Sequence, residues 1–299
     1  KVYFLKINGR HSMLIRAPAK INLCLYVLGE RPDGYHEIFS LMQAVSLYDE
    51  IEVLPAEKFS LTVEGAQIEG ENLIEKGHRV LCERVGRSLP VRVRLRKNIP
   101  IGAGLGGGSS DAAAFLSAVN RMFNLGLGRD ELMRLGAQVG SDVPFFFSGG
   151  SAAVFGRGEK VVPVRLPRDY WVVLIVPNFS VNTGWAYSRI RNYLTPPQRI
   201  TNLSYLEGVA SVFDFLDDCR NSFEAVVRGE YPQVNALFDA LKDAGAEKVL
   251  LSGSGSALFG VFREREGAQR AYDGIGGKAF GGSVEVAKKF LVLPVDIGF

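Results

Sequence analysis

The sequence predicts an α+β fold in two domains, and three observations lead to this prediction. Its 299 residues are about twice the length of a common domain of roughly 150 residues. Apolar residues make up 47% of the chain and charged residues 22%, as is typical of a soluble globular protein. Strand and helix patterns alternate irregularly, unlike the βαβα repeat of a parallel-sheet protein. We place the domains at residues 13–165 and 166–299.

Residues 1–12 are treated separately from these two domains. The chain starts with Lys1, and the first methionine is Met13. We expect residues 1–12 to be an added leader ahead of a natural start at Met13.

Strands dominate the beginning of the amino-terminal domain. Residues 13–28 are rich in Ile, Val and Leu around Pro18, which predicts two short strands or one bent strand. A turn follows at residues 30–34. Further strands are expected from their apolar patterns at 41–54, 59–63, 91–96 and, as a hairpin, 149–164.

Three helices are expected in the same domain. The first begins at Asn72, which has Glu75 three residues later, as in a capping box. Three alanines and a broad apolar face predict a second helix over 109–125, and a third is expected over 129–139. In the carboxy-terminal domain, we expect mainly helix over 182–244 and strands at 171–176, 248–251, 258–262 and 284–292.

Charge and cysteine content exclude several classes of protein. There are 35 Lys and Arg residues against 32 Asp and Glu, without a run of five like charges, so the chain gives no electrostatic support for binding nucleic acid or a membrane surface. Its apolar runs are shorter than the roughly 20 residues that span a bilayer. Cys24, Cys82 and Cys219 fit neither a disulfide framework nor a zinc site. We expect buried thiols, a cytoplasmic location and a monomer or homodimer.

A cluster of glycines is the strongest functional signal. Five glycines fall within residues 102–108, between a predicted strand and a predicted helix, and Ser109 and Ser110 follow at the expected helix cap. Glycines allow close approach of the backbone to a ligand, and a helix N-terminus offers free N–H groups, so the loop suits a phosphate. A flexible hinge is the plainer interpretation, but a hinge does not require this many glycines.

The loop does not fit the best-known phosphate-binding motifs. No Lys follows the glycines, as a Walker A loop requires. The acidic residue expected about 20 positions later in a dinucleotide-binding fold is replaced by a predicted helix. The H-R-D and D-F-G motifs of protein kinases are absent from the sequence. A phosphate loop of another kind is therefore predicted.

Two further motifs each contain one candidate catalytic side chain. Lys20 and Asn22 alternate with apolar residues and therefore share one face of a strand, where Lys20 either pairs with an anion or lies on a solvated face. Asp142 immediately precedes the aromatic run 145–147. Its carboxylate could accept a proton from a hydroxyl, or it could simply begin a turn before Pro144.

Two other motifs are less specific. The small-residue turn 251–257 could contact a phosphate or the glycine loop, or it could be a plain hairpin. Tyr35 and His36 could stack on and hydrogen-bond a planar base, although such a pair is more often structural packing. His11 and His78 have no sequence partners, and we expect them at the surface.

Taken together and in this order, the five motifs resemble those of the GHMP small-molecule kinases, over Met13 to about Val292. The motifs are PAKINL (18–23), GYHEI (34–38), NIPIGAGLGGGSSDAA (98–113), GSDVPFF (140–146) and LSGSGSALF (251–259). The extra glycines, GYHE and SDVPFF point to a member that acts on a cytidylyl methylerythritol, rather than on homoserine, mevalonate or galactose. The resemblance implies a ribosomal-protein-S5-like amino-terminal domain, a ferredoxin-like carboxy-terminal domain and an active site between them.

The resemblance also implies a reaction and its catalytic residues. ATP would phosphorylate the 2-hydroxyl of the cytidylyl substrate, with Mg²⁺ as cofactor. Asp142 would accept the hydroxyl proton, and Lys20 would keep Asp142 ionised and offset charge on the phosphoryl group. Ser110 is a possible Mg²⁺ ligand.

Binding residues are implied in the same way. ATP would be bound by Asn72, Leu73, Lys97, Pro100, Ile101, Gly102, Ala103, Gly104, Leu105, Gly106, Gly107, Gly108, Ser109 and Ser110. The acceptor would be bound by Asn22, Tyr35, His36, Thr183 and Tyr187. Trp185 departs from the small or aliphatic residue expected beside Tyr187, which leaves open which of the two stacks on the base, and we favour Tyr187.

Two alternatives remain at this point. One is a GHMP kinase for another small alcohol, because the glycine loop, Lys20 and Asp142 would serve any hydroxyl acceptor. The other is a nucleotide-binding module without catalysis, which would not need a proton-accepting carboxylate.

Overall fold

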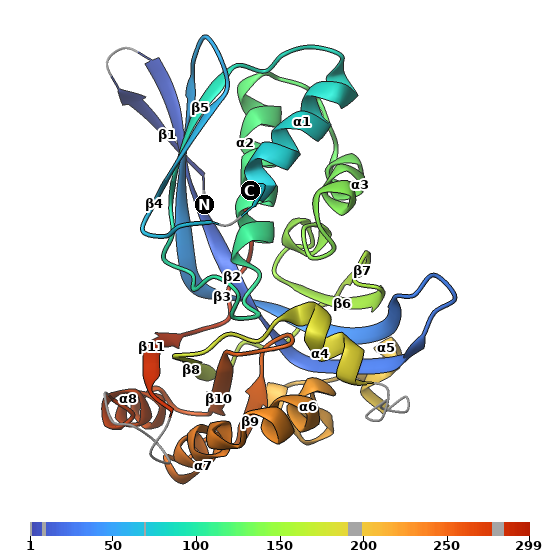
Figure 1. Ribbon diagram of the computed structural model, residues 1–299, viewed down its shortest axis with the longest axis vertical. Helices are drawn as coiled ribbons and strands as arrows, with labels where there is room; N and C mark the ends of the chain where they lie inside the picture. Colours follow the sequence, from blue (N-terminus) through green and yellow to red (C-terminus); the bar gives the residue numbers. More distant parts are fainter. Residues whose placement is uncertain (1, 8–9, 69, 191–198, 277–283) are drawn as a thin grey trace.

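The predicted α+β architecture is confirmed, with one sheet in each half of the chain (Figure 1). The structure, a computed structural model, describes residues 2–7, 10–68, 70–190, 199–276 and 284–299. In this described part the first sheet contains β1 to β7, and the second has the order β11-β8-β10-β9. The strands are β1 Val2–Ile7, β2 Arg10–Glu30, β3 His36–Pro55, β4 Ser60–Glu64, β5 Val91–Arg96, β6 Ser151–Gly156, β7 Lys160–Pro163, β8 Trp171–Pro177, β9 Lys248–Leu251, β10 Leu258–Phe262 and β11 Val286–Val292.

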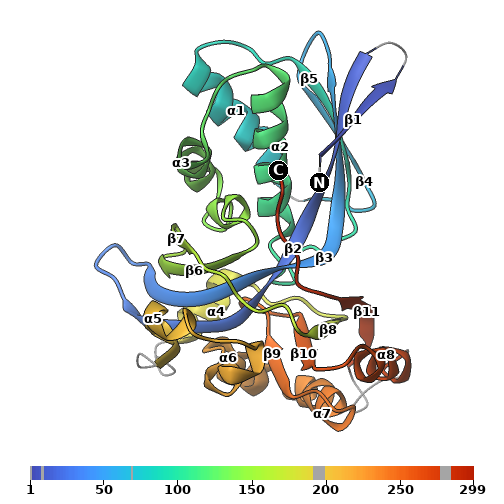
Figure 2. The same cartoon turned by 180° about the vertical axis from the view of Figure 1, so that it is seen from behind.

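Helices cover one face of each sheet. Helices α1 to α3 lie against the first sheet, and α6 to α8 lie on the outer face of the second sheet (Figure 1, and from behind in Figure 2). The α-helices are α1 Leu73–Val85, α2 Gly107–Met122, α3 Arg129–Val139, α4 Thr183–Arg189, α5 Leu203–Leu206, α6 Phe223–Glu230, α7 Asn235–Asp243 and α8 Arg265–Gly274. Short 3-10 helices are η1 Pro144–Phe147, η3 Arg199–Thr201, η4 Val212–Asp214, η5 Leu216–Asp218 and η6 Pro232–Val234.

A long ribbon of β2 and β3 joins the two halves. Its pairing shifts register between Pro18 and Ala19, because Pro18 cannot donate to the ladder. The strand continues past this irregularity, so the bent-strand alternative is correct. On one side of the bend β3 pairs with β5, and on the other side it pairs with β6. The second half of the ribbon packs against the second sheet in a shared apolar core that contains Ile21 and Leu23. Lys20 and Asn22 alternate with these residues, and they hydrogen-bond to the first half at Leu105 and to the second half at Gly253.

Local signals located several elements accurately. Asn72 caps α1, and the capping box with Glu75 is present. The apolar positions of β5 are buried and its arginines are exposed, as the alternation predicts. Helix α3 and strands β9 and β10 have the predicted bounds.

Some expectations need correction. His78 is not a surface residue: it is half-buried, and its ring stacks on Phe59 at 4.0 Å because both rings help to cover Phe115. Cys24 and Cys219 are buried as expected, but Cys82 on α1 is only half-buried, although it packs against the core of the first domain. The His11 side chain lies outside the described residues.

The two ends of the chain both lie against the first domain. Strand β1, within the expected leader, pairs with the start of β2, while the origin of residues 1–12 stays a prediction. Residues 293–299 run back from β11 to the first domain (Figure 2), where Val295 and Ile297 pack on its core. The domain boundary near residue 165 also stays a prediction; it falls in the connection between β7 and β8.

No helix in the described part of the chain is both long and apolar enough to cross a bilayer.

Candidate active site

The glycine loop, residues 100–106, leads from the end of β5 into α2. Gly102, Gly104 and Gly106 have φ angles of +69°, +77° and +69°, which strongly favour glycine. The helix begins at Gly107, earlier than the predicted Ser109. The loop therefore ends directly on a helix N-terminus, as the phosphate interpretation requires.

The prediction that Ser109 and Ser110 cap this helix is wrong. The cap residue is Gly106, and no side chain makes a cap hydrogen bond there. The physical reason is crowding, because a Cβ on Gly106 would lie 2.9 Å from Lys20 Cγ and one on Gly107 would lie 3.0 Å from Ile99 Cγ2. Both serines lie in the first turn of α2, and its N–H groups are left without a side-chain cap.

A turn from the second domain packs on the glycine loop. Ser252 Oγ donates to the carbonyl oxygen of Gly104 at 3.0 Å, and the N–H of Ala257 donates to that of Ala103 at 3.2 Å. A Cβ on Gly104 would lie only 2.1 Å from the Ser252 carbonyl oxygen. Of the interpretations considered for residues 251–257, contact with the glycine loop is thus confirmed.

Lys20 and Asp142 lie together beside this loop. The Lys20 Nζ is 3.6 Å from Asp142 Oδ2, and the backbone N–H of Lys20 donates to Leu105 at 2.9 Å. The Lys20 side chain is only 4% exposed, whereas that of Asp142 is 32% exposed. The solvated-face interpretation of Lys20 is therefore wrong, and Asp142 is the member of the pair that reaches the solvent.

Burial lowers the pKa of Lys20, and the neighbouring Asp142 carboxylate partly opposes this shift. The ammonium is also held by Asn22, whose Oδ1 accepts from Lys20 Nζ at 2.6 Å. The same oxygen accepts the N–H of Gly253 at 2.9 Å, and the Asn22 amide donates to Ser40 at 2.7 Å. Asn22 thus fixes Lys20 against both the ribbon and the turn of the second domain.

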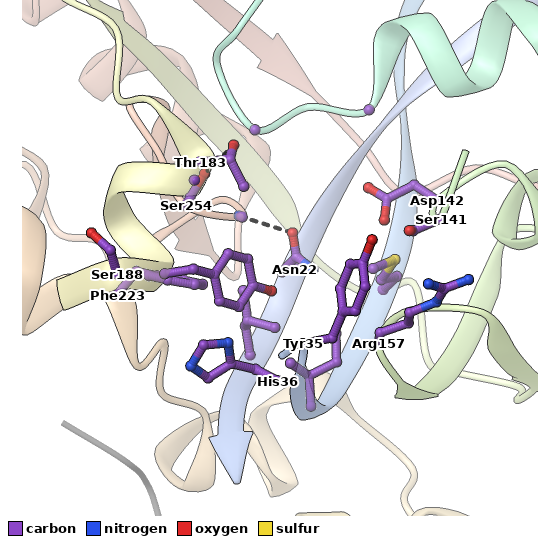
Figure 3. Close-up of a pocket in the computed structure, with 18 of the residues that line it drawn as sticks. Asn22, Tyr35, His36, Ser141, Asp142, Arg157, Thr183, Ser188, Phe223 and Ser254 are labelled. Carbon is purple, nitrogen blue, oxygen red and sulfur yellow. Dashed lines mark hydrogen bonds between the residues drawn. The ribbon is translucent and has the colours of Figure 1, made fainter. Parts of the chain in front are cut away.

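One cavity of about 860 Å³ connects the glycine loop, the Lys20–Asp142 pair and the aromatic motif (Figure 3). Gly104 and Gly106 line one end, and Tyr35 and His36 line the other. This volume is in the usual range for a small-molecule site. The predicted acceptor residues Asn22, Tyr35, His36, Thr183 and Tyr187 all line it.

The aromatic end is built from both domains. The rings of His36 and Tyr187 are 5.1 Å apart, and Phe223 packs edge-on against Tyr187 at 4.8 Å. Burial raises the pKa of Tyr187 to about 12, so its hydroxyl stays protonated at neutral pH. Tyr35 is 53% exposed, and among the described residues the buried His36 Nε2 has no hydrogen-bond partner. These groups are open to a planar ligand that can stack and hydrogen-bond.

Tyr187 and Trp185 have different surroundings. Tyr187 lines the cavity, whereas the ring of Trp185 packs edge-on against Tyr231 at 6.0 Å. The geometry is consistent with the preference for Tyr187. Thr183 lies nearby, with its hydroxyl 2.9 Å from Ser254 Oγ.

The three residues expected near adenine lie around the start of α2. Leu73 Cδ1 is 3.7 Å from the Cβ position of Gly108, and the buried Asn72 Nδ2 has no partner among the described residues. Lys97 is buried, and its ammonium pairs with Asp49 and, at 2.7 Å, with Asp111. Its role is thus first of all to neutralise two buried carboxylates beneath the loop.

Comparison with protein-family models identifies the family of this chain. The model of the GHMP kinases N terminal domain matches residues 72–150, and that of the GHMP kinases C terminal domain matches residues 210–281. The first match contains the glycine loop and Asp142. The chain belongs to the GHMP kinases. It is therefore a small-molecule kinase, and the two-domain GHMP fold inferred from the motifs is confirmed.

Curated relatives of this GHMP kinase extend over most of its length. A 4-diphosphocytidyl-2-C-methyl-D-erythritol kinase from Geobacillus sp. (strain WCH70) is 37% identical over 278 residues, covering 89% of this chain and 93% of the relative. One of the same name from Solibacter usitatus (strain Ellin6076) is 39% identical over 273 residues, covering 89% and 86%.

Two solved structures illustrate the similarity of this chain to known kinases. A crystal structure of 4-(cytidine 5'-diphospho)-2C-methyl-D-erythritol kinase is 32% identical and superimposes with a TM-score of 0.78, covering 95% of this chain and 99% of that one. A homoserine kinase from Cytophaga hutchinsonii ATCC 33406 is 20% identical with a TM-score of 0.63, covering 99% and 98%. The latter likeness concerns the fold alone.

Sequence reasoning missed several residues of this GHMP kinase that line the cavity. Arg157 lies in a tight turn between two glycines, a pattern that predicts a hairpin but not a binding residue. Ser141 and Ser254 also line the cavity, although the motifs that contain them predict other residues as the site residues. Phe223 is one of many apolar helix residues, and nothing local in the sequence marks it.

A matched pair of glycine variants tests how the loop is held. Gly104→Ala and Gly102→Ala both place a side chain at positive φ, but only at Gly104 would the Cβ meet a backbone atom, since Gly102 has nothing within 4 Å. We expect Gly104→Ala to raise the KM for ATP by about tenfold or more and Gly102→Ala by no more than about threefold. Steady-state kinetics at saturating acceptor would measure both. Equal increases would show that the contact with the Ser252 turn does not position the loop.

Proposed function

We propose that this kinase transfers the γ-phosphoryl group of ATP to the 2-hydroxyl of 4-diphosphocytidyl-2-C-methyl-D-erythritol, giving the 2-phosphate and ADP. This places it in non-mevalonate isoprenoid precursor synthesis. One observation carries the proposal: a single cavity contains a buried Lys paired with a carboxylate at the glycine loop and an aromatic group suited to a base at the other end. The names of the curated relatives support the same substrate.

In this proposal Asp142 accepts the proton of the acceptor hydroxyl. Its carboxylate is partly exposed and therefore accessible to an alcohol in the cavity, with the Lys20 ammonium 3.6 Å from it. The Lys20 ammonium also offsets negative charge that accumulates on the transferring phosphoryl group. Asn22 keeps Lys20 in place and contacts the methylerythritol.

ATP is proposed to bind with its phosphates along residues 100–110, where the N–H groups of the loop and of the first turn of α2 would donate to phosphate oxygens. Asn72 and Leu73 would flank the adenine, and the unpartnered amide of Asn72 is suited to hydrogen-bond it. Lys97 would act there by holding the base of the loop.

Mg²⁺ is proposed as the cofactor, since it neutralises phosphate charge in such transfers. The Ser110 hydroxyl is buried in the first turn of α2 and has no hydrogen-bond partner among the described residues, which fits a single protein ligand. Mg²⁺ usually takes most of its other ligands from phosphates and water.

Cytosine is proposed to stack between Tyr35 and Tyr187, while the unpartnered His36 Nε2 hydrogen-bonds its edge. Thr183 would contribute a hydroxyl contact. A cytoplasmic enzyme, monomeric or homodimeric and without nucleic-acid partners, remains the expectation from the sequence.

The test is a coupled ADP-release assay with Mg²⁺-ATP and four separate acceptors: the cytidylyl methylerythritol, homoserine, mevalonate and galactose. Turnover confined to the cytidylyl compound is the expected result. Turnover with another alcohol would retain the phosphoryl-transfer chemistry but reject the cytosine site. Failure with all four, in protein that binds ATP, would favour the non-catalytic alternative.

A further inference from the structure

The charges that line the cavity are unevenly paired. Glu30 and Asp142 contribute carboxylates, and Lys20 and Arg157 contribute cations. Lys20 is already engaged by Asp142 and Asn22. Among the residues that the structure describes, Arg157 has no carboxylate within ion-pair distance, and its side chain is exposed to the cavity. It is thus the cation there that remains available to an anionic ligand.

The backbone around Arg157 is fixed between the two functional ends of the cavity. On one side, the N–H of Gly156 donates to the Glu37 carboxylate at 3.1 Å, next to His36. On the other side, the Cβ position of Gly158 lies 3.9 Å from Asp142 Oδ1. Gly156 and Gly158 have φ angles of +71° and +116°, so this tight turn depends on both glycines.

The N–H of Arg157 itself donates to Glu159 Oε2 at 2.8 Å, which closes the turn. The guanidinium lies over the ring of Tyr35, 4.8 Å from its centre. Figure 3 shows it beside Tyr35 and close to Ser141 and Asp142. The charge therefore lies against Tyr35, on a turn that also approaches Asp142.

We propose that Arg157 binds the diphosphate that links the cytidine to the methylerythritol. The inference rests on the proposed function, because it places the base at Tyr35 and the hydroxyl at Asp142, and the diphosphate then spans the space between them. The Lys20 ammonium is already paired with Asp142, so a second cation is needed to offset the charge of a diphosphate in this cavity. A guanidinium suits this task because its planar set of donors can contact two phosphate oxygens at once.

Binding of cytidine and of CDP, without ATP, separates this role from a structural one. Calorimetry would compare the wild type, Arg157→Gln, and Arg165→Gln as a control that changes an exposed arginine outside the cavity. We expect Arg157→Gln to weaken CDP about tenfold and to leave cytidine within about twofold, since only CDP carries the diphosphate. Arg157→Lys should recover part of the CDP affinity, and the control should match the wild type.

Kinetics add a second readout. With the full substrate, Arg157→Gln should raise the KM for the acceptor about tenfold and leave the KM for ATP unchanged. Equal weakening of cytidine and CDP would overturn the inference, because Arg157 would then act through Tyr35. An increased KM for ATP or a fall in kcat alone would overturn it as well. If the wild type bound neither cytidine nor CDP, the proposed function would fail together with the inference.

Discussion

Asp142→Asn is expected to lower kcat by roughly 10²–10⁴-fold while the affinity for ATP stays within about twofold of the wild type. The amide has nearly the same shape as the carboxylate but cannot accept the hydroxyl proton or pair ionically with Lys20. Single-turnover assays would give the chemical rate, and calorimetry with ATP would give the affinity. Asp239→Asn, which changes an exposed carboxylate on α7 far from the cavity, is the control and should behave like the wild type.

The size of the loss distinguishes two roles for Asp142. A fall in kcat of less than about tenfold would contradict proton acceptance by Asp142. It would indicate a loose phosphoryl-transfer transition state, in which the attacking hydroxyl needs little deprotonation. In that case the carboxylate would serve mainly to orient the acceptor. Loss of ATP affinity along with kcat would point instead to a disturbed glycine loop.

Lys97→Met is expected to cost about 3–5 kcal/mol of stability, the second large effect. Lys97 lies between the buried carboxylates of Asp49 and Asp111, and without its ammonium both would lack a counter-charge. We expect the melting temperature to fall by roughly 5–15 °C. Lys58→Met, at an exposed position, is the control and should shift it by no more than about 1–2 °C.

The direction of the pKa shift of Lys97 determines the pH at which the melting temperatures should be compared. The carboxylates raise the pKa of Lys97 above its ordinary 10.5, although burial opposes the shift. A raised folded-state pKa means that the stabilisation is complete below about pH 10.5 and is lost as the pH rises through the raised value. Measurements near pH 7.5 therefore report the full effect.

A double variant tests the same cluster more sharply. Burial raises the pKa of Asp111 well above its usual value, and its Oδ1 has no hydrogen-bond partner among the described residues. Asp49, by contrast, accepts the N–H groups of Asn98 and Ile99 at 2.6 and 2.8 Å. Adding Asp111→Asn to Lys97→Met should therefore recover part of the lost stability. A further decrease would show that the two carboxylates do not repel each other.

The features that the sequence predicts correctly are determined by residues that are close together in the chain. The capping box at Asn72 and the burial pattern of β5 are determined by residues a few positions apart. The glycine loop was recognisable for the same reason, since its positive φ angles need glycine wherever the chain folds. The predicted start of α2 at Ser109 is wrong because Lys20 and Ile99 leave no room for a side chain at the true start of the helix. Lys20 is distant in sequence and Ile99 lies outside the helix, so neither contact can be read from the local pattern.

The remaining parts of the site depend on long-range contacts. Lys97 meets Asp49, 48 residues away, and this partner was invisible in the local pattern. Lys20 alone favoured a solvated face, and only the fold shows that Leu105, Asn22 and Asp142 enclose it. The sequence does not indicate Arg157 because a single charged residue in a turn is common. Its role depends on Tyr35 and Asp142, against which the turn packs.

The return of residues 293–299 to the first domain bears on how the protein is made. The N–H of Val295 donates to Ala44 at 2.9 Å and that of Ile297 to Gly149 at 3.2 Å, while the Cβ position of Gly150 lies 2.5 Å from the Val295 carbonyl oxygen. During translation the first domain emerges from the ribosome long before the segment that completes it. Domains usually fold in order of synthesis, but here the first domain is completed by a segment that is synthesised after the second domain. The final packing of the first domain is therefore reached only after residues 293–299 have left the ribosome.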